Sequence, residues 1–141
     1  QFREALCRAD MEIGDWANKI LGMPVFATVP QEVDIDLVNV SALELGFTSR
    51  TTREKIYARA IEHGLEMCPA EVGPQLRLQY GDQALGEMLL VGMKPIVDMS
   101  NYPSVFYVGR TQRGMWLHSV NGRSGYGWSP TERWVFVLPR K

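Results

Sequence analysis

The chain has 141 residues, of which 45% are hydrophobic and 22% are charged. These proportions are those of an ordinary globular protein, and the length suits one fold unit, so we predict a single globular domain over residues 1–141. Lys and Arg number 15 and Asp and Glu 16, and the resulting net charge of −1 excludes a broad basic surface for nucleic acid or acidic lipid. No apolar run is long enough for a membrane span and no signal-peptide pattern opens the chain, so a cytoplasmic location without membrane contact is the default expectation.

The N-terminal segment carries an apolar stripe at helical spacing. Gly14-Asp15 interrupts the stripe, Asp15 is a suitable helix cap, and Gly22 is a suitable helix end. The segment therefore predicts one bent helix or two helices in tandem. The residues of the stripe are Phe2, Ala5, Leu6, Ala9, Ile13, Trp16, Ala17, Ile20 and Leu21.

A strand with one wet face is predicted next, because Val33, Ile35 and Leu37 alternate with Asp34 and Asp36. Apolar residues on alternate positions of a strand lie on one face and the acidic residues on the other. Helical signals follow this strand directly.

Two capping-box patterns then predict helices. Ser41-x-x-Glu44 is followed closely by glycine, so it predicts a helix of little more than one turn. Thr51-x-x-Glu54 opens a longer helix over residues 52–63.

The second half of the chain predicts strands. Leu76, Leu78 and Tyr80 alternate with Arg77 and Gln79, which favours a strand over residues 75–80. Its partner and three further strands are predicted at Met88 to Met93, Val105 to Val108, Met115 to Val120 and Arg133 to Leu138. The order of elements gives an α+β fold in which N-terminal helices pack on a mainly antiparallel sheet of about five to six strands.

The leading functional hypothesis is a soluble binding domain for a small polar or anionic ligand or a protein partner. On the predicted strand 75–80 a guanidinium and two carboxamides share the polar face, and a guanidinium pairs well with carboxylate or phosphate. A glycine-rich loop in the last third adds aromatic side chains suited to contacts. The candidate ligand-binding residues are Gln75, Arg77, Gln79, Arg123, Tyr126 and Trp128.

The simpler interpretation of the polar face is a solvated sheet on which Arg77 forms an ion pair with Glu71 or Glu87. Among the aromatic residues, Trp128 in the loop is the best candidate for a contact residue. Trp116 and His118 share one face of their predicted strand.

An enzyme of hydrolase or transferase type is the first alternative. Cys68 is then the nucleophile, His118 its base and Glu71 an acid or base. The apolar neighbours of Cys68 favour instead a buried thiol, and we expect Cys7 and Cys68 both to be free.

Nucleic-acid binding through the helix 52–63 is the second alternative, because Arg50, Arg53, Lys55 and Arg59 gather there. Acidic residues dilute this charge, which favours an ordinary solvated helix face. The chain contains no phosphate-binding glycine loop and no histidine pair at metal-binding spacing, so we expect neither a cofactor nor a metal.

Three segments together resemble a group of uncharacterised bacterial proteins, many of them from uncultivated lineages. The segments begin at Ile13 with IGDWANKILG, at Cys68 with CPAEVGPQLRLQY and at Trp134 with WVFVLPR, and the second is the most distinctive. The resemblance extends over nearly the whole chain. It implies a bacterial origin and a single-domain unit, and it assigns no activity to any residue.

Overall fold

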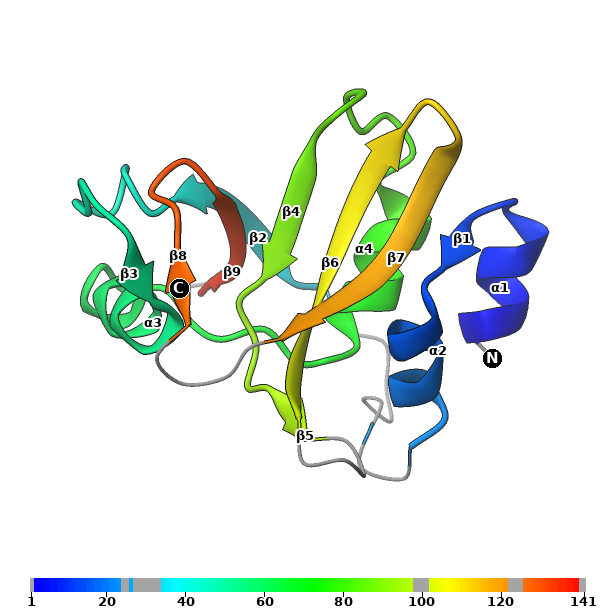
Figure 1. The fold of residues 1–141 in the computed structure, drawn as a ribbon, viewed down its shortest axis with the longest axis horizontal. Coiled ribbons are helices and arrows are strands. Elements are labelled where there is room, and N and C mark those ends of the chain that lie inside the picture. Colours follow the sequence, from blue (N-terminus) through cyan, green and yellow to red (C-terminus); the bar gives the residue numbers. More distant parts are fainter. Residues whose placement is uncertain (1, 24–25, 27–33, 98–101, 122–125, 140–141) are drawn as a thin grey trace.

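The computed structural model describes residues 2–23, 26, 34–97, 102–121 and 126–139 (Figure 1). Its first half contains most of the helices and its second half most of the strands, as the sequence pattern predicts. The elements are α1 (Phe2–Arg8), β1 (Glu12–Ile13), α2 (Asp15–Leu21), β2 (Asp36–Ser41), β3 (Thr51–Thr52), α3 (Arg53–Glu62), α4 (Val72–Gln79), β4 (Met88–Val91), β5 (Ile96–Val97), β6 (Pro103–Thr111), β7 (Gly114–Asn121), β8 (Gly127–Trp128) and β9 (Arg133–Leu138).

The main sheet has seven strands, in the order β1-β7-β6-β4-β9-β2, with β5 paired to β6 beside this path. The pairs β1 with β7 and β4 with β9 are parallel, and the other pairs are antiparallel. The strands β3 and β8 form a separate two-stranded sheet. The predicted α+β fold with a mainly antiparallel sheet is confirmed; the sheet is larger than expected because it includes the two-residue strands β1 and β5.

One face of the sheet, here called the α4 face, packs against α1, α2 and α4. Strand residues of this face, among them Leu89, Phe106, Leu117 and Val135, are at most 3% exposed. They share a core with buried residues of α1, α2 and α4, including Leu6, Ala17, Ile20 and Val72. The three helices therefore form one layer, which covers this face of the sheet.

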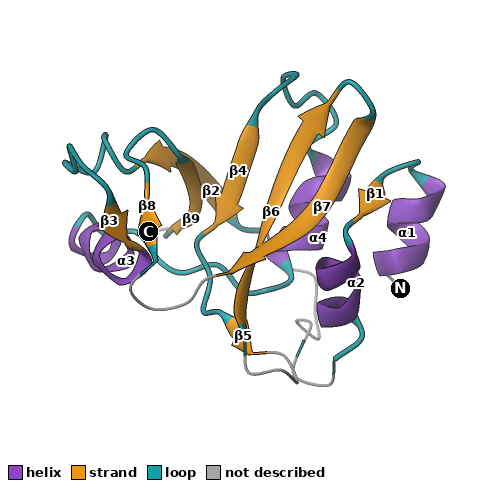
Figure 2. Cartoon of the chain, viewed as in Figure 1, coloured by secondary structure: helices purple, strands orange, loops and turns teal. Residues whose placement is uncertain are grey.

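The opposite face, here called the α3 face, packs against α3 and the small sheet. Leu90, Trp134 and Phe136 lie on this face and form a second core with Ile56 and Tyr57 of α3. The Tyr57 ring meets the rings of Trp134 and Phe136 edge to face, with centroids 5.8 Å apart in both pairs. Figure 2 shows α3 at the opposite end of the molecule from α1 and α2.

The N-terminal segment forms two helices, as one of the two predicted arrangements requires. Gly14 rather than Asp15 is the N-cap of α2, and Gly22 is its C-cap as expected. Between the helices, β1 lies in parallel beside β7. The Gly14 N–H donates to the carbonyl oxygen of Leu117 at 2.8 Å and fixes the start of α2 at the sheet.

The strand predicted from Val33 to Leu37 is displaced along the chain. Val33 lies outside the described residues, and β2 begins at Asp36 and continues through Ser41. Its six residues pair with β9 without a bulge, from Asp36 opposite Leu138 to Ser41 opposite Arg133. Pairing with β9 sets the bounds of β2. The alternation of apolar and acidic residues in the sequence does not indicate this pairing.

The two capping-box predictions have different outcomes. Ser41 and Glu44 exchange two hydrogen bonds, one from the Ser41 N–H to Glu44 Oε1 at 2.9 Å and one from the Glu44 N–H to Ser41 Oγ at 3.0 Å. The hydrogen bonds of this box are confirmed, but the predicted short helix is wrong, because residues 42–46 form turns. At the second position the cap of α3 is Thr52, whose hydroxyl accepts from the Lys55 N–H at 3.3 Å, one residue after the predicted Thr51.

The strand predicted over residues 75–80 is wrong, because this segment belongs to α4. Pro74 lies in the first turn of the helix, where its missing N–H costs no intrahelical hydrogen bond. Gly73 allows the helix to approach the sheet, since a Cβ atom at this position would lie 2.5 Å from Cδ2 of Phe106. Packing of α4 on β6 therefore replaces the predicted pairing of residues 75–80 with the strand at Met88 to Met93, and β4 pairs with β6 and β9 instead.

Candidate functional site

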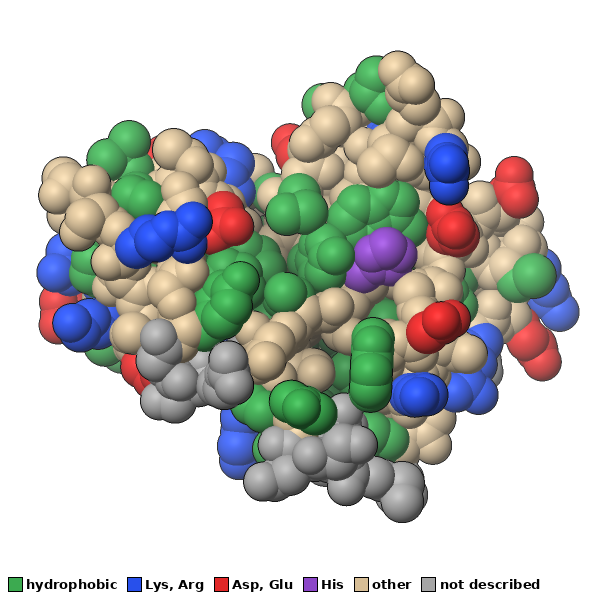
Figure 3. Space-filling model, in the orientation of Figure 1, with side chains coloured by type: hydrophobic (Ala, Val, Ile, Leu, Met, Phe, Trp, Pro, Cys, Tyr) green, Lys and Arg blue, Asp and Glu red, His purple; other side chains and the backbone are tan. Residues whose placement is uncertain are grey.

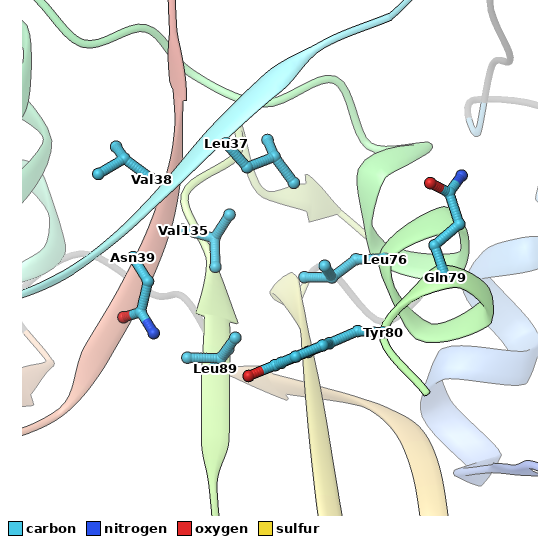
Figure 4. Close-up of a pocket in the computed structure, with 8 residues that line it drawn as sticks. All are labelled: Leu37, Val38, Asn39, Leu76, Gln79, Tyr80, Leu89 and Val135. Atoms are coloured by element: carbon cyan, nitrogen blue, oxygen red, sulfur yellow. The ribbon is translucent and has the colours of Figure 1, made fainter. Parts of the chain in front are cut away.

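An apolar groove lies between α4 and the edge strand β2 (Figure 4). The groove lies on the α4 face, beside the part of the sheet that α4 covers. It forms because α4 packs on β6 and β7, whereas β9 and β2 extend beyond this helix. The floor is Leu89 and Val135, and Leu76 of α4 and Leu37 of β2 form the walls. The groove has a volume of about 270 Å³.

Polar groups border the apolar floor on two sides. Asn39 projects from β2 toward the floor, and the hydroxyl end of Tyr80 reaches over Leu89 from the end of α4 (Figure 4). Asn39 Oδ1 accepts a hydrogen bond from Arg133 Nε at 2.8 Å, which leaves its Nδ2 group as a donor. The interaction of the Tyr80 hydroxyl with the Glu87 carboxylate raises the pKa of Tyr80, because the carboxylate favours the protonated phenol.

Gln79 stands at the outer rim of this groove, and its amide points away from the floor (Figure 4). It donates to Gln75 Oε1 at 3.0 Å, as residues four apart on a helix can. The two candidate glutamines, Gln75 and Gln79, are thus neighbours on the outer side of α4. Of the candidate residues that the structure describes, Gln79 is the one at the groove.

Arg77 points the other way, into the protein, and is 0% exposed. It donates to Gln83 Oε1 at 2.6 Å, to the Gly109 carbonyl oxygen at 2.9 Å and to the Tyr80 carbonyl oxygen at 2.8 Å. Among the described residues no carboxylate pairs with Arg77, so the expected ion pairs with Glu71 or Glu87 are wrong as well. Arg77 is a structural cation rather than a surface group, and burial lowers its pKa.

The aromatic loop does not meet Arg77. Trp128 is 4% exposed and belongs to the core of the α3 face, whereas Arg77 binds the sheet from the α4 face. Trp128 pairs through β8 with Thr51 of β3, so it is a core side chain and not the expected contact residue. Tyr126 is 42% exposed beside it, and Arg123 lies outside the described residues. The site that combines Arg77 with Trp128 is not formed.

The residues of the enzyme hypothesis also lie apart. The Cys68 thiol is buried in the core of the α4 face and donates to the Val135 carbonyl oxygen at 3.3 Å. Burial raises its pKa to about 12, so the reactive thiolate is absent at neutral pH. His118 instead contacts the rings of Tyr107 and Trp116, on the α3 face. Glu71 is half-buried at the start of α4.

The rings of Tyr107, Trp116 and His118 form a cluster on the α3 face. The Tyr107 hydroxyl lies 3.3 Å from His118 Nδ1, and the Trp116 and His118 rings stack at 4.3 Å. Glycines provide the space, because a Cβ atom on Gly109 would overlap Trp116 and one on Gly14 would overlap His118. Figure 3 shows apolar side chains gathered on this side of the molecule, over the middle strands.

The basic residues near α3 are engaged in contacts within the protein. The Arg59 guanidinium donates to the Leu45 carbonyl oxygen at 2.8 Å and lies over the Phe47 ring. Arg50 donates to the Gly127 carbonyl oxygen at 2.9 Å, and Arg53 lies over the Tyr57 ring. Only Lys55 of the four predicted cations is an exposed helix residue without such a contact in the described part of the chain.

The sequence pattern missed Leu76, Tyr80 and Asn39 as site residues. A helical interpretation of residues 72–80 places Leu76 and Tyr80 on one stripe at a spacing of four, and that spacing was the signal available. None of the helices that the structure describes has the length and apolar character that crossing a bilayer requires. In the same residues, no group of three or more His, Cys, Asp or Glu side chains is placed to hold a metal.

The fold and the groove define an α+β domain with a half-open apolar groove at one edge of its sheet. Comparisons with protein-family models, with curated proteins and with solved structures found no match.

Proposed function

We propose that this domain binds a small ligand with an apolar body and a hydrogen-bonding end in the groove between α4 and β2. The observation that carries the proposal is the pairing of an apolar floor, Leu89 and Val135, with two polar side chains that face it, Asn39 and Tyr80. Ligand sites in proteins combine apolar walls with a few placed polar groups in this way.

The apolar part of the site supplies affinity. Each square ångström of apolar surface that leaves water contributes about 25 cal/mol. Because Leu89 and Val135 are already at most 3% exposed, the surface that a ligand can cover lies mainly on the walls, Leu37 and Leu76. Leu37 is 36% exposed, so much of its surface still contacts water. A compact apolar group fits the volume of about 270 Å³ better than a large ring system.

The polar part of the site supplies orientation. Arg133 fixes the Asn39 amide through Oδ1, and the remaining Nδ2 group donates to an acceptor on the ligand. A carbonyl, carboxylate or amide oxygen at one end of the ligand meets this requirement. The Tyr80 hydroxyl, held beside Glu87, borders the same end of the floor.

We also propose that bacterial proteins with a CPAEVGPQLRLQY-like segment form the same groove. Leu76, Gln79 and Tyr80 all come from this segment, so the distinctive part of the sequence supplies one wall of the site. A difference at Leu76 or Tyr80 among such proteins changes the ligand rather than the fold, since neither residue is fully buried.

A thermal-shift screen with short carboxylic acids, amides and their aromatic analogues tests the proposal. A ligand at one hundred times its Kd stabilises the folded state by about 2.7 kcal/mol, which a melting curve detects readily. The variant Leu76→Trp fills the groove and abolishes the shift. The matched variant Leu85→Trp changes an exposed leucine in the turn before β4 and retains it. Compounds that stabilise both variants equally bind elsewhere and contradict the proposal.

A further inference from the structure

The strand β2 is an edge strand, and the residues that the structure describes place no strand on its outer side. Natural edge strands are guarded against pairing by proline, lysine, bulges or covering segments. The six residues of β2, DLVNVS, contain no proline or lysine and a single charge, Asp36 at the first position, and their register with β9 has no bulge. This edge has the features of a strand that takes a partner.

The backbone groups that face outward can be assigned from the ladder with β9. The Ala42 N–H donates to the Glu132 carbonyl oxygen, and alternate residues of an antiparallel strand direct their groups to the same side. Val40 and Val38 therefore bond to β9, whereas Leu37, Asn39 and Ser41 face the open edge. The Ser41 groups confirm this, because its N–H donates to Glu44 Oε1 and its carbonyl oxygen accepts from the Leu45 N–H.

Leu37 and Asn39 keep N–H and carbonyl groups that have no partner among the described residues. We propose that a second copy of this chain occupies the edge, with the two β2 strands antiparallel about a twofold axis at Val38. Leu37 of each copy then exchanges both backbone hydrogen bonds with Asn39 of the other. This register satisfies every outward backbone group of these two residues, and the edge is complementary to itself.

The side chains allow the same register. Val38 lies opposite Val38 of the second copy on the α3 face, Leu37 lies opposite Asn39 on the α4 face, and Asp36 lies opposite Val40. No charged side chain faces another directly, and the Asp36 residues of the two copies are separated by four positions along the strand, roughly 13 Å. The register therefore avoids the like-charge opposition that destabilises cross-strand pairs.

Disulfide crosslinking tests this register on the full chain. In the proposed dimer the Val38 positions form a non-hydrogen-bonded pair with Cβ atoms about 4.5–5.5 Å apart, close enough for a disulfide after a small adjustment. The experiment uses a Cys7→Ser background, because Cys7 is exposed, whereas Cys68 is buried. On mild oxidation Val38→Cys forms a linked dimer at least about tenfold faster than the control Leu85→Cys, since pairing raises the effective thiol concentration.

Sedimentation of the unmodified chain supplies the second measurement. We expect a concentration-dependent dimer that Asn39→Pro converts to a monomer, because proline removes an outward N–H and leaves the β9 ladder intact. The same variant keeps its circular dichroism spectrum, which separates loss of pairing from loss of folding. A monomer at every concentration, or equal crosslinking of Val38→Cys and Leu85→Cys, overturns the proposal.

Discussion

The guanidinium of Arg77 donates a 2.9 Å hydrogen bond to the carbonyl oxygen of Gly109, which joins α4 to the strand β6. Gly109 is also the residue over which the Trp116 ring lies, since a Cβ atom there would overlap the indole. One buried cation therefore fixes α4, which forms a wall of the groove, to the strand pair that carries the ring cluster. A change at Arg77 is expected to affect the stability of the whole domain.

Replacement of Arg77 by methionine is predicted to lower the free energy of unfolding by about 2–4 kcal/mol, because Gln83, itself 0% exposed, and two carbonyl groups lose their donor. Arg77→Lys keeps the charge and loses the planar fork, so it recovers only part of the loss. Urea unfolding measures both values, with Arg113→Met at an exposed position as the control. Equal stability of Arg77→Met and Arg113→Met would show that the buried network contributes nothing.

Gly73→Ala is predicted to destabilise the domain by about 1–3 kcal/mol, because the added methyl group overlaps the Phe106 ring and forces α4 away from the sheet. Gly81→Ala is the matched control, since a Cβ atom at Gly81 meets nothing within 4 Å. Thermal unfolding of the two variants provides the comparison. If the two glycines tolerate alanine alike, the close approach of α4 to β6 is incorrect.

The free energy of unfolding is predicted to fall as the pH rises above about 8.5, where a thiol in the unfolded chain ionises. Burial raises the pKa of Cys68 to about 12 in the folded protein, so over this interval the unfolded state loses a proton that the folded state keeps. Burial raises the pKa of Tyr57 in the same direction. Cys68 alone contributes a slope of at most about 1.4 kcal/mol per pH unit.

Denaturant unfolding of Cys68→Ala between pH 8.5 and 9.5 separates this slope from the ionisation of tyrosine and lysine, because these groups, with ordinary pKa values near 10, are still mostly protonated there. The variant is less stable overall because a core side chain is shortened, but its stability changes less with pH. Cys7→Ala, at an exposed position, should retain the slope of the parent chain. A parallel pH dependence for Cys68→Ala and the parent would contradict the burial of this thiol.

Glu12→Gln is predicted to lower the pKa of His118. Burial of the imidazole lowers this pKa below its ordinary value, and the Glu12 charge opposes that shift. Because the folded pKa is lowered, the contribution of His118 to stability is lost as the pH falls below about 6.5, where the unfolded chain takes up a proton. An NMR titration of the His118 ring follows the change, with Glu4→Gln on α1 as the control; an unchanged or raised pKa in Glu12→Gln excludes the Glu12 interaction.

The strands β6, β7 and β9 were predictable from sequence because each is a run rich in apolar, β-branched or aromatic residues that is bounded by turn residues. The helix α4 was not predictable from the sequence pattern. Leu76, Leu78 and Tyr80 satisfy a strand period, and Gly73-Pro74 signals a break, yet both residues lie in the first turn of the helix. Only the contact of Gly73 with Phe106, far away in sequence, explains why a glycine suits that position.

The candidate site depended on the same error. A strand puts Arg77 beside Gln75 and Gln79, whereas the helix turns Arg77 inward and leaves the two carboxamides outside. Trp128 was assigned to a loop because glycines precede it, but pairing with β3 buries it. Asn39 has no local signal, since its role arises from the edge position of β2 and its contact with Arg133.

The central claim is that the groove between α4 and β2 binds a ligand, and methyl NMR of the leucine and valine side chains tests it most directly. Titration with a compound from the thermal-shift screen is predicted to shift the methyl signals of Leu37, Leu76, Leu89 and Val135 together, with one affinity. Leu43 and Leu85, exposed elsewhere, serve as internal controls and should not move. Shifts confined to other methyl groups, or none in the four groove residues at saturation, would contradict the proposed function.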